Sequence, residues 1–238
     1  AAFTPQRLSE LAKMDGAIIL AGNASRIARA NVHLVPDSNV PTSETGTRHR
    51  TAERVARSIH VPVISASERM GAISVYVGDQ KHPLAPIPRI LDRTNQALST
   101  LERYKARLDE VEANLSAREV EDSVTLGDVV AVLQRTEMVA RIADEIERYI
   151  VELGDDGRLV RLQLEELFAG VSDDRRLVLL DYFYDDLGTE GPERALSALA
   201  DLTTEELLDL GDVAGVLHLP DGIDLDLDLE PRGYRLLS

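Results

Sequence analysis

The sequence predicts an α/β domain, with a mixed sheet flanked by helices, followed by an all-helical region. Up to about Pro86, short runs rich in β-branched residues alternate with turn signals such as Gly22-Asn23, which is typical of strands. From Pro86 onward, apolar residues recur at spacings of three and four, which is typical of helices that bury one face. We set the boundary between an α/β domain over 1–98 and a helical domain over 99–238.

Local signals justify each element of the first region. Thr4 precedes Pro5 as an N-cap precedes a proline at the first helical position, so a helix begins there. The next segments are short, apolar and bounded by turn residues. We expect strands over 16–20, 26–32, 61–65 and 72–77, a loop over 36–46 and a helix over 47–58.

The second region reads as a series of helices. Spacing predicts long helices over 87–113 and 125–153, and Gly154 is expected to end the second of them. Capping-box patterns, which start helices, occur at Ser116 with Glu119 and at Thr203 with Glu206. Further helices are expected over 158–169 and 174–184. The segment 221–230 alternates Asp with Ile or Leu, which fits both an edge strand and a solvated tail.

Composition excludes several classes of protein. Of the 238 residues, 44% are hydrophobic, which is enough to bury a core and excludes wholesale disorder. Aromatic residues are 4% with no Trp, which argues against a platform for stacking bases. The absence of Cys excludes disulfides, Cys-ligated zinc and thiol chemistry, and favours a cytoplasmic protein. No apolar run approaches the roughly 18 residues of a membrane helix, so no membrane partner is expected.

Charge divides the chain in the same way. Residues 1–98 hold 12 basic and 8 acidic side chains, whereas 99–238 hold 14 and 34, so the respective net charges are +4 and −20. The cationic first region can attract a polyphosphate, and the acidic second region repels one and also repels duplex DNA. Solvated helix faces that aid solubility are an alternative reason for the acidity.

The densest chemical cluster lies at 42–51, where hydroxyls and a glycine lead into Arg48-His49-Arg50 at the expected start of a helix. Free backbone N–H groups and the positive end of the helix dipole favour phosphate there. Arg48 and Arg50 add planar, permanently charged donors suited to phosphate oxygens. A solvated basic turn with ordinary caps is the structural alternative.

Asp15 is the second candidate, because it stands between an expected helix and an expected buried strand. Asp is a common turn former in such places. Next to a phosphate cradle it has another use, since phosphoryl transfer needs a hard divalent cation and a carboxylate is its natural protein ligand.

These residues resemble a known family. The segments 15–17, 30–34 and 46–54 are similar to the diadenylate cyclase domain, with its Asp-Gly-Ala and Arg-His-Arg motifs in this order. Two later segments, 95–98 and 101–105, resemble the branch of that family formed by the DNA integrity scanning (DisA) proteins. The resemblance implies an enzyme that condenses two ATP into cyclic di-AMP and two pyrophosphates, with Mg²⁺ or Mn²⁺ as cofactor.

The resemblance also implies roles for single residues. Asp15 would hold the metal and help to activate the 3′-hydroxyl, so it counts as catalytic together with Arg48, His49 and Arg50. The residues implied to bind the nucleotide are Gly16, Ala17, Leu34, Thr47, Arg48, His49, Arg50 and Thr51, the last five of them at the phosphates.

The expected partners follow from the same resemblance. Members assemble as homo-octamers with pairs of cyclase domains face to face, and they bind branched DNA through a helix-hairpin-helix domain. We expect that DNA-binding domain, and also the start of the cyclase domain, to lie outside this chain. Two other functions stay open: a module that senses a nucleotide without turning it over, and a DNA-repair scaffold acting through the helical region. Asp15 speaks against the first, and the acidic charge after residue 98 against the second.

Overall fold

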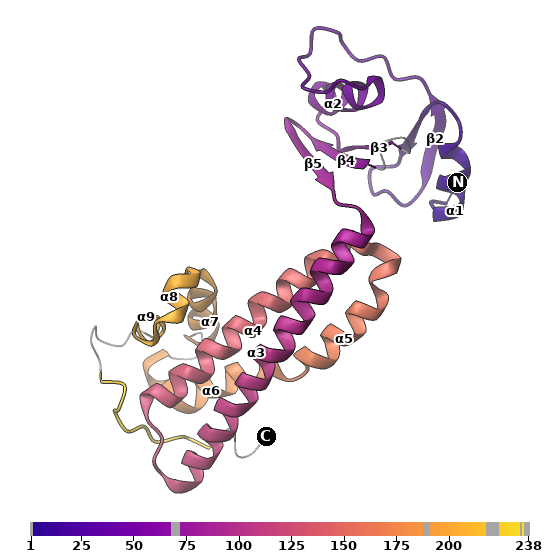
Figure 1. The fold of residues 1–238 in the computed structure, drawn as a ribbon. Coiled ribbons are helices and arrows are strands. Elements are labelled where there is room, and N and C mark those ends of the chain that lie inside the picture. Colours follow the sequence, from indigo (N-terminus) through magenta and orange to yellow (C-terminus); the bar gives the residue numbers. More distant parts are fainter. Residues whose placement is uncertain (1, 68–71, 188–190, 218–223, 234, 236–238) are drawn as a thin grey trace. The chain divides into compact units, whose positions relative to one another are not determined.

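The computed structural model describes residues 2–67, 72–187, 191–217, 224–233 and 235 (Figure 1). The chain forms two compact units, Ala1–Pro86 and Ile87–Ser238. The expected boundary after residue 98 falls within one continuous helix that begins at Ile87. The division lies at the start of that helix, since the helix packs along its length within the second unit.

The first unit is an α/β unit, as predicted. Its expected elements form with ends within two residues of the predicted ones. Within the described residues the strands pair antiparallel in two small sheets, β1-β2 and β3-β4-β5, where a mixed sheet was expected. The elements are α1 (Pro5–Ala12), β1 (Ala17–Leu20), β2 (Ile27–Val32), α2 (Thr47–Ile59), β3 (Val63–Ser67), β4 (Ala72–Val77) and β5 (Gln80–Leu84).

Helix α2 packs on β3 and β4, and the small core of the unit lies between them. Tyr76 of β4 is fully buried against Ala52 and Ala56 of α2. Two alanines on one helix face let the helix approach the sheet closely enough for one large ring to fill the layer. This packing fixes where the first turn of α2 stands.

Strand β5 was not predicted. It pairs antiparallel with β4 after the Gly78-Asp79 turn, with Val77 opposite Gln80 and Ile73 opposite Leu84. Its sequence, Gln-Lys-His-Pro-Leu, lacks the alternation that marks a strand. Pro83 is tolerated because β5 has only one neighbouring strand and so needs hydrogen bonds on one side alone.

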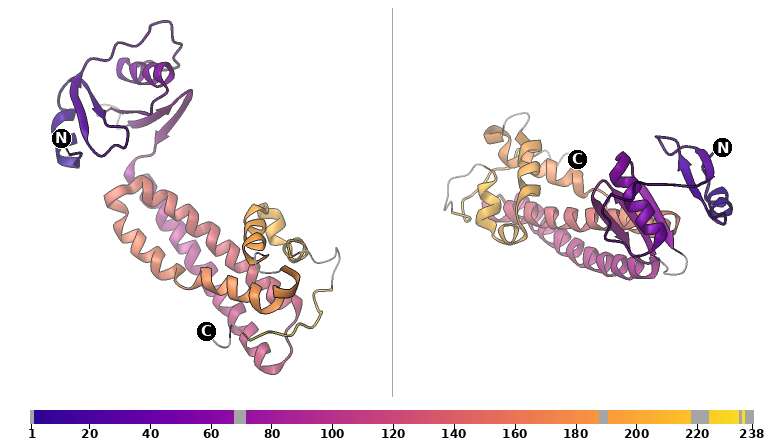
Figure 2. Two further views of the ribbon diagram at one scale, coloured as in Figure 1. Left: turned by 180° about the vertical axis from the view of Figure 1, so that it is seen from behind. Right: turned by 90° about the horizontal axis from the view of Figure 1, so that it is seen from above.

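The second unit is all helical, as predicted, and is built on a long antiparallel helix pair (Figure 1). A row of buried residues runs along α3 towards α4, including Ile90, Leu101, Leu108 and Leu115. Figure 2 shows α5 lying beside this pair. The elements are α3 (Ile87–Glu121), α4 (Leu126–Leu153), η1 (Gly154–Gly157), α5 (Arg158–Phe168), α6 (Val171–Leu187), α7 (Gly191–Asp201), α8 (Thr204–Leu208) and α9 (Leu210–Gly215).

One of the two predicted capping boxes is wrong and the other is confirmed. Ser116 and Glu119 lie inside α3, which continues to Glu121, because Leu115 and Glu119 belong to its buried face. The chain turns at Asp122, whose φ is +55°. Thr203 and Glu206 do form a capping box, at the start of α8.

Helix α4 begins and ends at the expected residues. Its N-cap is Thr125, in a capping box with Asp128, and its C-cap is Gly154 with φ +57°. Helix α7 was not predicted, although its buried residues Ala195 and Leu199 have helical spacing. No helix among the described residues has both the length and the apolar content needed to cross a membrane.

The alternating acidic segment is neither a sheet strand nor a free tail. Positions 221–223 of it lie outside the described residues, but 224–229 lie along the start of α4, with a turn at Leu225-Asp226 closed by a hydrogen bond from the Leu227 N–H to the Asp224 carbonyl. The carbonyls of Leu227 and Leu225 accept hydrogen bonds from the N–H groups of Leu126 and Gly127, both at 2.8 Å. The N–H of Leu229 donates to the carbonyl of Val124 at 2.9 Å. We call this segment, 224–229, the strap.

A buried polar cluster ties the chain after the strap to α3 and α6. Arg235 and Tyr182 both donate to Glu119 Oε1, at 2.8 and 2.6 Å. Burial, and then the hydrogen bond to Glu119, raise the pKa of Tyr182 far above its ordinary value. The backbone N–H of Arg235 donates to Asp181 at 2.9 Å.

Candidate nucleotide-binding site

The Asp15-Gly16-Ala17 segment enters β1 through a tight approach to β2. A Cβ added at Gly16 would lie 2.6 Å from Asn31 Oδ1 and 2.7 Å from the Asn31 backbone. Asn31 itself has a φ of +54°. Only glycine therefore fits at position 16 without a backbone shift, which explains the residue type beside Asp15 on packing grounds.

The β1-β2 pairing brings two further candidates to the same end of this sheet. Ala17 pairs with Val32 in the antiparallel register. Leu34 follows two residues later, so it lies just beyond the end of the ladder from which Asp15 emerges. Ala17 and Leu34 are both partly buried. The structure thus places 15–17 and Leu34 at the same end of the β1-β2 sheet.

The first turn of α2 lies beside Asp15. Arg48 Nη2 donates to Asp15 Oδ1 at 2.7 Å, and the two side chains are 71% and 91% exposed. The N-cap of α2 is Gly46, which has no side chain to occupy the free N–H groups of the first turn. An anion can therefore reach these N–H groups and the Arg48 guanidinium from the same side.

The other predicted phosphate residues separate into exposed and buried ones. Thr47 and Arg50 are exposed, and Thr51 is half-buried one turn along the helix. Among the described residues, Arg50 has no ion-pair partner. His49 is different, because it is 5% exposed and lies on the buried face of α2. Its imidazole has little surface to offer a phosphate in this structure.

A buried carboxylate, which the sequence analysis did not single out, holds the loop that leads to α2. Glu53 accepts hydrogen bonds from the Thr42 hydroxyl, from the Ser43 N–H at 3.1 Å and from the Ser43 hydroxyl at 3.3 Å. Arg57 pairs with the same carboxylate at 3.1 Å and donates to the Pro41 carbonyl at 2.6 Å. Arg54 donates to the Val40 carbonyl at 2.8 Å.

A second carboxylate ties the loop to the sheet. Glu44 accepts a hydrogen bond from the hydroxyl of Tyr76 at 2.9 Å and pairs with Lys81. The hydrogen bond with Lys81, more than the one with Tyr76, holds the pKa of Glu44 below its ordinary value. Burial and then the hydrogen bond to Glu44 raise the pKa of Tyr76. The loop before α2 is thus fixed to α2 by Glu53 and to β4 and β5 by Glu44.

The metal implied by the family has one carboxylate at this site. No group of three or more His, Asp or Glu side chains that could hold a metal occurs among the described residues. Mg²⁺ commonly uses only one or two protein carboxylates and completes its shell with water and substrate phosphates. The exposed Asp15 carboxylate, beside Arg48 and the open first turn of α2, fits that pattern.

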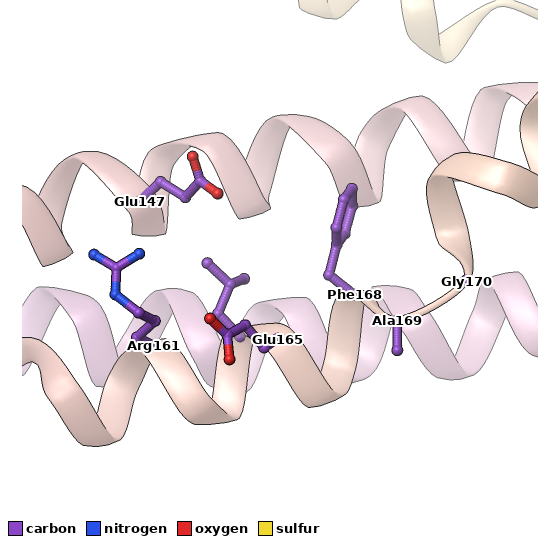
Figure 3. A pocket seen from close by; sticks show the side chains of 7 residues that line it. Glu147, Arg161, Glu165, Phe168, Ala169 and Gly170 are labelled. Atoms are coloured by element: carbon purple, nitrogen blue, oxygen red, sulfur yellow. The ribbon is translucent and has the colours of Figure 1, made fainter.

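A cavity in the helical unit has no part in this site. It measures about 300 Å³, lies between α4 and α5, and is lined by residues that include Glu147, Arg161, Glu165 and Phe168 (Figure 3). It shares no residue with the site built around Asp15 and Arg48.

Comparison with known proteins gives the family. Residues 84–225 match the DisA bacterial checkpoint controller linker region, and residues 1–81 match the DisA bacterial checkpoint controller nucleotide-binding domain. The chain belongs to the DisA family. Its α/β unit therefore corresponds to the DisA nucleotide-binding domain and its helical unit to the DisA linker.

Several relatives named DNA integrity scanning protein DisA are similar over nearly the whole chain. One from Frankia casuarinae is 54% identical over 237 residues, which is 99% of this chain and 66% of the relative. Those from Kineococcus radiotolerans and Streptomyces coelicolor are 56% and 52% identical over 99% of this chain, and 66% and 64% of the relatives. The chain thus spans about two thirds of the length of these DisA proteins.

Proposed function

We propose that this chain is the part of a DisA protein that condenses two ATP into cyclic di-AMP and two pyrophosphates. The observation that carries the proposal is the contact between Asp15 and Arg48, which come from segments 33 residues apart and meet beside the open first turn of α2. A carboxylate, a guanidinium and free backbone N–H groups on one side supply what nucleotidyl transfer requires.

Most of the work in this reaction is positioning and charge stabilisation. The 3′-oxygen of each ATP bonds to the α-phosphorus of the other, the α–β bridging bond breaks, and pyrophosphate leaves as the hydroxyl proton is released. Arg48, Arg50 and the first-turn N–H groups would hold the phosphates, with Thr47 and Thr51 as further donors. Gly16, Ala17 and Leu34 would line the pocket, and His49 would support the α2 end from its buried side.

Arg48 has to exchange Asp15 for phosphate when the nucleotide binds. Because both side chains are exposed, their ion pair stabilises the free state by at most about 1 kcal/mol. Breaking the Asp15–Arg48 ion pair therefore costs little free energy. The Asp15 carboxylate would then be free to hold Mg²⁺ or Mn²⁺, which would balance phosphate charge and lower the pKa of the attacking hydroxyl.

The product has twofold symmetry, which supports two identical half-sites from two facing protomers. One protomer with one ATP cannot bring a second α-phosphate to its own 3′-hydroxyl. We therefore propose face-to-face pairs of α/β units, within an octamer as the family resemblance implies, acting in the cytoplasm where ATP is available. Specific activity should rise with protein concentration until the oligomer is saturated.

The test is product formation by the Asp15→Asn variant. With ATP and Mg²⁺ or Mn²⁺, we expect the wild type to yield cyclic di-AMP by mass spectrometry, and Asp15→Asn to lose at least about 100-fold in rate. Asp92→Asn, which removes one exposed carboxylate from α3, is the matched control and should keep the wild-type rate. Near-wild-type turnover by Asp15→Asn would overturn the role of this carboxylate.

The same assay separates the proposal from a nucleotide sensor. A wild-type chain that binds ATP and metal but forms no product at any protein concentration would be a sensor. Excess Asp15→Asn protein should also inhibit the wild type, since mixed pairs have a damaged half-site. A wild-type rate unaffected by both dilution and added variant, where subunits are shown to exchange, would contradict the two-half-site mechanism.

DNA is not proposed as a partner of these two units. The acidic helical unit repels phosphate, and two of the cationic residues of the α/β unit, Arg48 and Arg50, are proposed to bind ATP. We expect weak binding of this chain to duplex or branched DNA at physiological salt in a gel-shift titration. Binding of branched DNA by family members would then depend on a part of the protein outside residues 1–238. Tight, junction-selective DNA binding by this chain would contradict the expectation.

A further inference from the structure

We propose that Glu53 is a positioning residue, which orders the 40–46 loop so that the first turn of α2 is ready to receive the nucleotide phosphates. The inference rests on the proposed function and adds a residue to it. Glu53 lies too far inside the unit to touch a nucleotide itself, since its side chain is 6% exposed.

Burial of an acidic side chain needs compensation, and every contact of Glu53 supplies it. An unpaired carboxylate in this place would lose its hydration and gain no hydrogen bonds or ion pairs to compensate. Its two oxygens instead accept from the Thr42 hydroxyl, the Ser43 N–H, the Ser43 hydroxyl and Arg57. The contacts on the loop side come from consecutive residues, so the carboxylate fixes the backbone there and not only a side chain.

The ordered loop leads directly into the proposed phosphate site. Three residues separate Ser43 from Thr47, where α2 begins with Gly46 as its N-cap. On its other side the loop is held by Arg54 and Arg57, which bind the carbonyls of Val40 and Pro41. Glu53 shares α2 with Arg48, so one rigid helix carries both the phosphate-binding arginine and the anchor of the loop.

This arrangement predicts an effect on nucleotide binding and little effect on the chemical step. A disordered loop must be ordered again when the phosphates bind, which weakens binding, whereas Asp15 and Arg48 remain in place for the reaction. A purely structural role would give a different result. It would lower the folded fraction, and with it the apparent kcat, while the remaining folded molecules kept their affinity.

The test compares Glu53→Gln with the wild type in the full chain, at a temperature where both are folded. Gln keeps the shape but loses the charge and one acceptor oxygen. We expect the KM for ATP, and the Kd of a non-hydrolysable ATP analogue with Mg²⁺, to rise about tenfold, with kcat within about threefold of wild type. Amide exchange in peptides covering 42–46 should accelerate at least about tenfold. Glu10→Gln, an exposed glutamate of α1, is the matched control and should change none of these.

A second set of variants removes the two hydroxyl donors to Glu53 and keeps Glu53 itself. The double variant Thr42→Val with Ser43→Ala should also raise the Kd, and should add little to the rise in a Glu53→Gln background, because the two hydroxyl contacts that it removes are among those that Glu53→Gln weakens. Ser38→Ala, in an exposed position just before the 40–46 loop, is the control. Full additivity of the two lesions would overturn the proposal, because Glu53 would then act by another route.

The outcomes separate this inference from the proposed function. If the wild type binds the analogue but makes no cyclic di-AMP, the proposed reaction fails, and the Kd comparison still decides the role of Glu53. An unchanged Kd in Glu53→Gln overturns the positioning role whether or not loop exchange accelerates. If the wild type binds no nucleotide, both proposals fail.

Discussion

The two units are held together by different means. In the α/β unit, the core between α2 and the sheet consists of small residues around Tyr76, and buried polar side chains such as Glu53 and Ser74 share the interior. In the helical unit, long rows of Leu, Ile and Val are buried along α3 and α4. Its polar clusters, such as that around Glu119, which shares the buried face of α3 with Leu115, add to these rows and do not replace them.

The difference follows from what each unit has to hold in place. Apolar packing stabilises a helix pair efficiently but is not directional, so it fixes helices and not the path of a loop. A loop that presents backbone N–H groups to a ligand needs directional contacts, which buried carboxylates provide. The α/β unit therefore depends on hydrogen bonds where the helical unit depends on buried area.

The largest expected effect is a loss of stability when a buried apolar side chain of the helical unit is truncated. Leu133 of α4 is 1% exposed, and Leu133→Ala should lower the free energy of unfolding of the helical unit by about 3–4 kcal/mol through lost burial and a residual cavity. Hydrogen exchange of α3 and α4 peptides in denaturant measures it. Nucleotide affinity should stay unchanged, and Leu162→Ala, a change at an exposed leucine of α5, should cost far less.

A smaller effect is expected on the polar side. Tyr76→Phe keeps the ring that fills the core but removes the hydroxyl that donates to Glu44. Because the acceptor is charged, we expect a loss of about 1–2 kcal/mol in the stability of the α/β unit, read from exchange of β4 and α2 peptides. Tyr104→Phe in the helical unit, where the hydroxyl has no hydrogen bond to a described residue, serves as the control. Equal losses in the two variants would remove the distinction between the units.

The smallest predicted effect is a pH dependence. In the folded chain the pKa of Glu44 lies below the ordinary 4.5, so the unfolded chain binds more protons around that pH. The contribution of Glu44 is therefore present above pH 4.5 and is lost as the pH falls through the folded pKa. Unfolding of the α/β unit, followed between pH 6 and 3 (about the range where carboxylates titrate), should show a shallower acid loss in Glu44→Gln. An unchanged slope would mean that Glu44 is not the group responsible.

Much of the fold could be predicted because its signals are local. Thr4-Pro5, Thr125 and Gly154 start or end helices through their own backbone and side-chain chemistry. The Ser116–Glu119 pattern failed because a capping box and a stretch of helix interior can share the same residues, and burial of Leu115 decides between them. Strand β5 could not be seen, since pairing with β4 and not its composition makes it a strand.

The candidate site was only partly predictable for the same reason. The motif residues Asp15 and Arg48 could be chosen by their chemistry, and the structure brings them together. Glu53 and His49 lie on the helix face that also carries Ala52 and Ala56, at spacings of three and four. A charged residue on the buried face of an amphipathic helix was the signal for Glu53. Its partners on the loop, ten and eleven residues earlier, depend on the tertiary fold and could not be read from spacing.

The strap has a consequence for the order in which the helical unit is completed. The first N–H groups of α4 are bound by carbonyls of Leu225 and Leu227, which are synthesised about a hundred residues later. While the chain is still emerging from the ribosome, α3 and α4 can pair through nearby contacts, but the start of α4 has to wait for its acceptors. Gly127 leaves room for this late arrival, since a Cβ there would lie 3.2 Å from the Leu225 carbonyl. Closing so long a loop makes the docking of the strap a late folding step, one that seals a helix pair already formed.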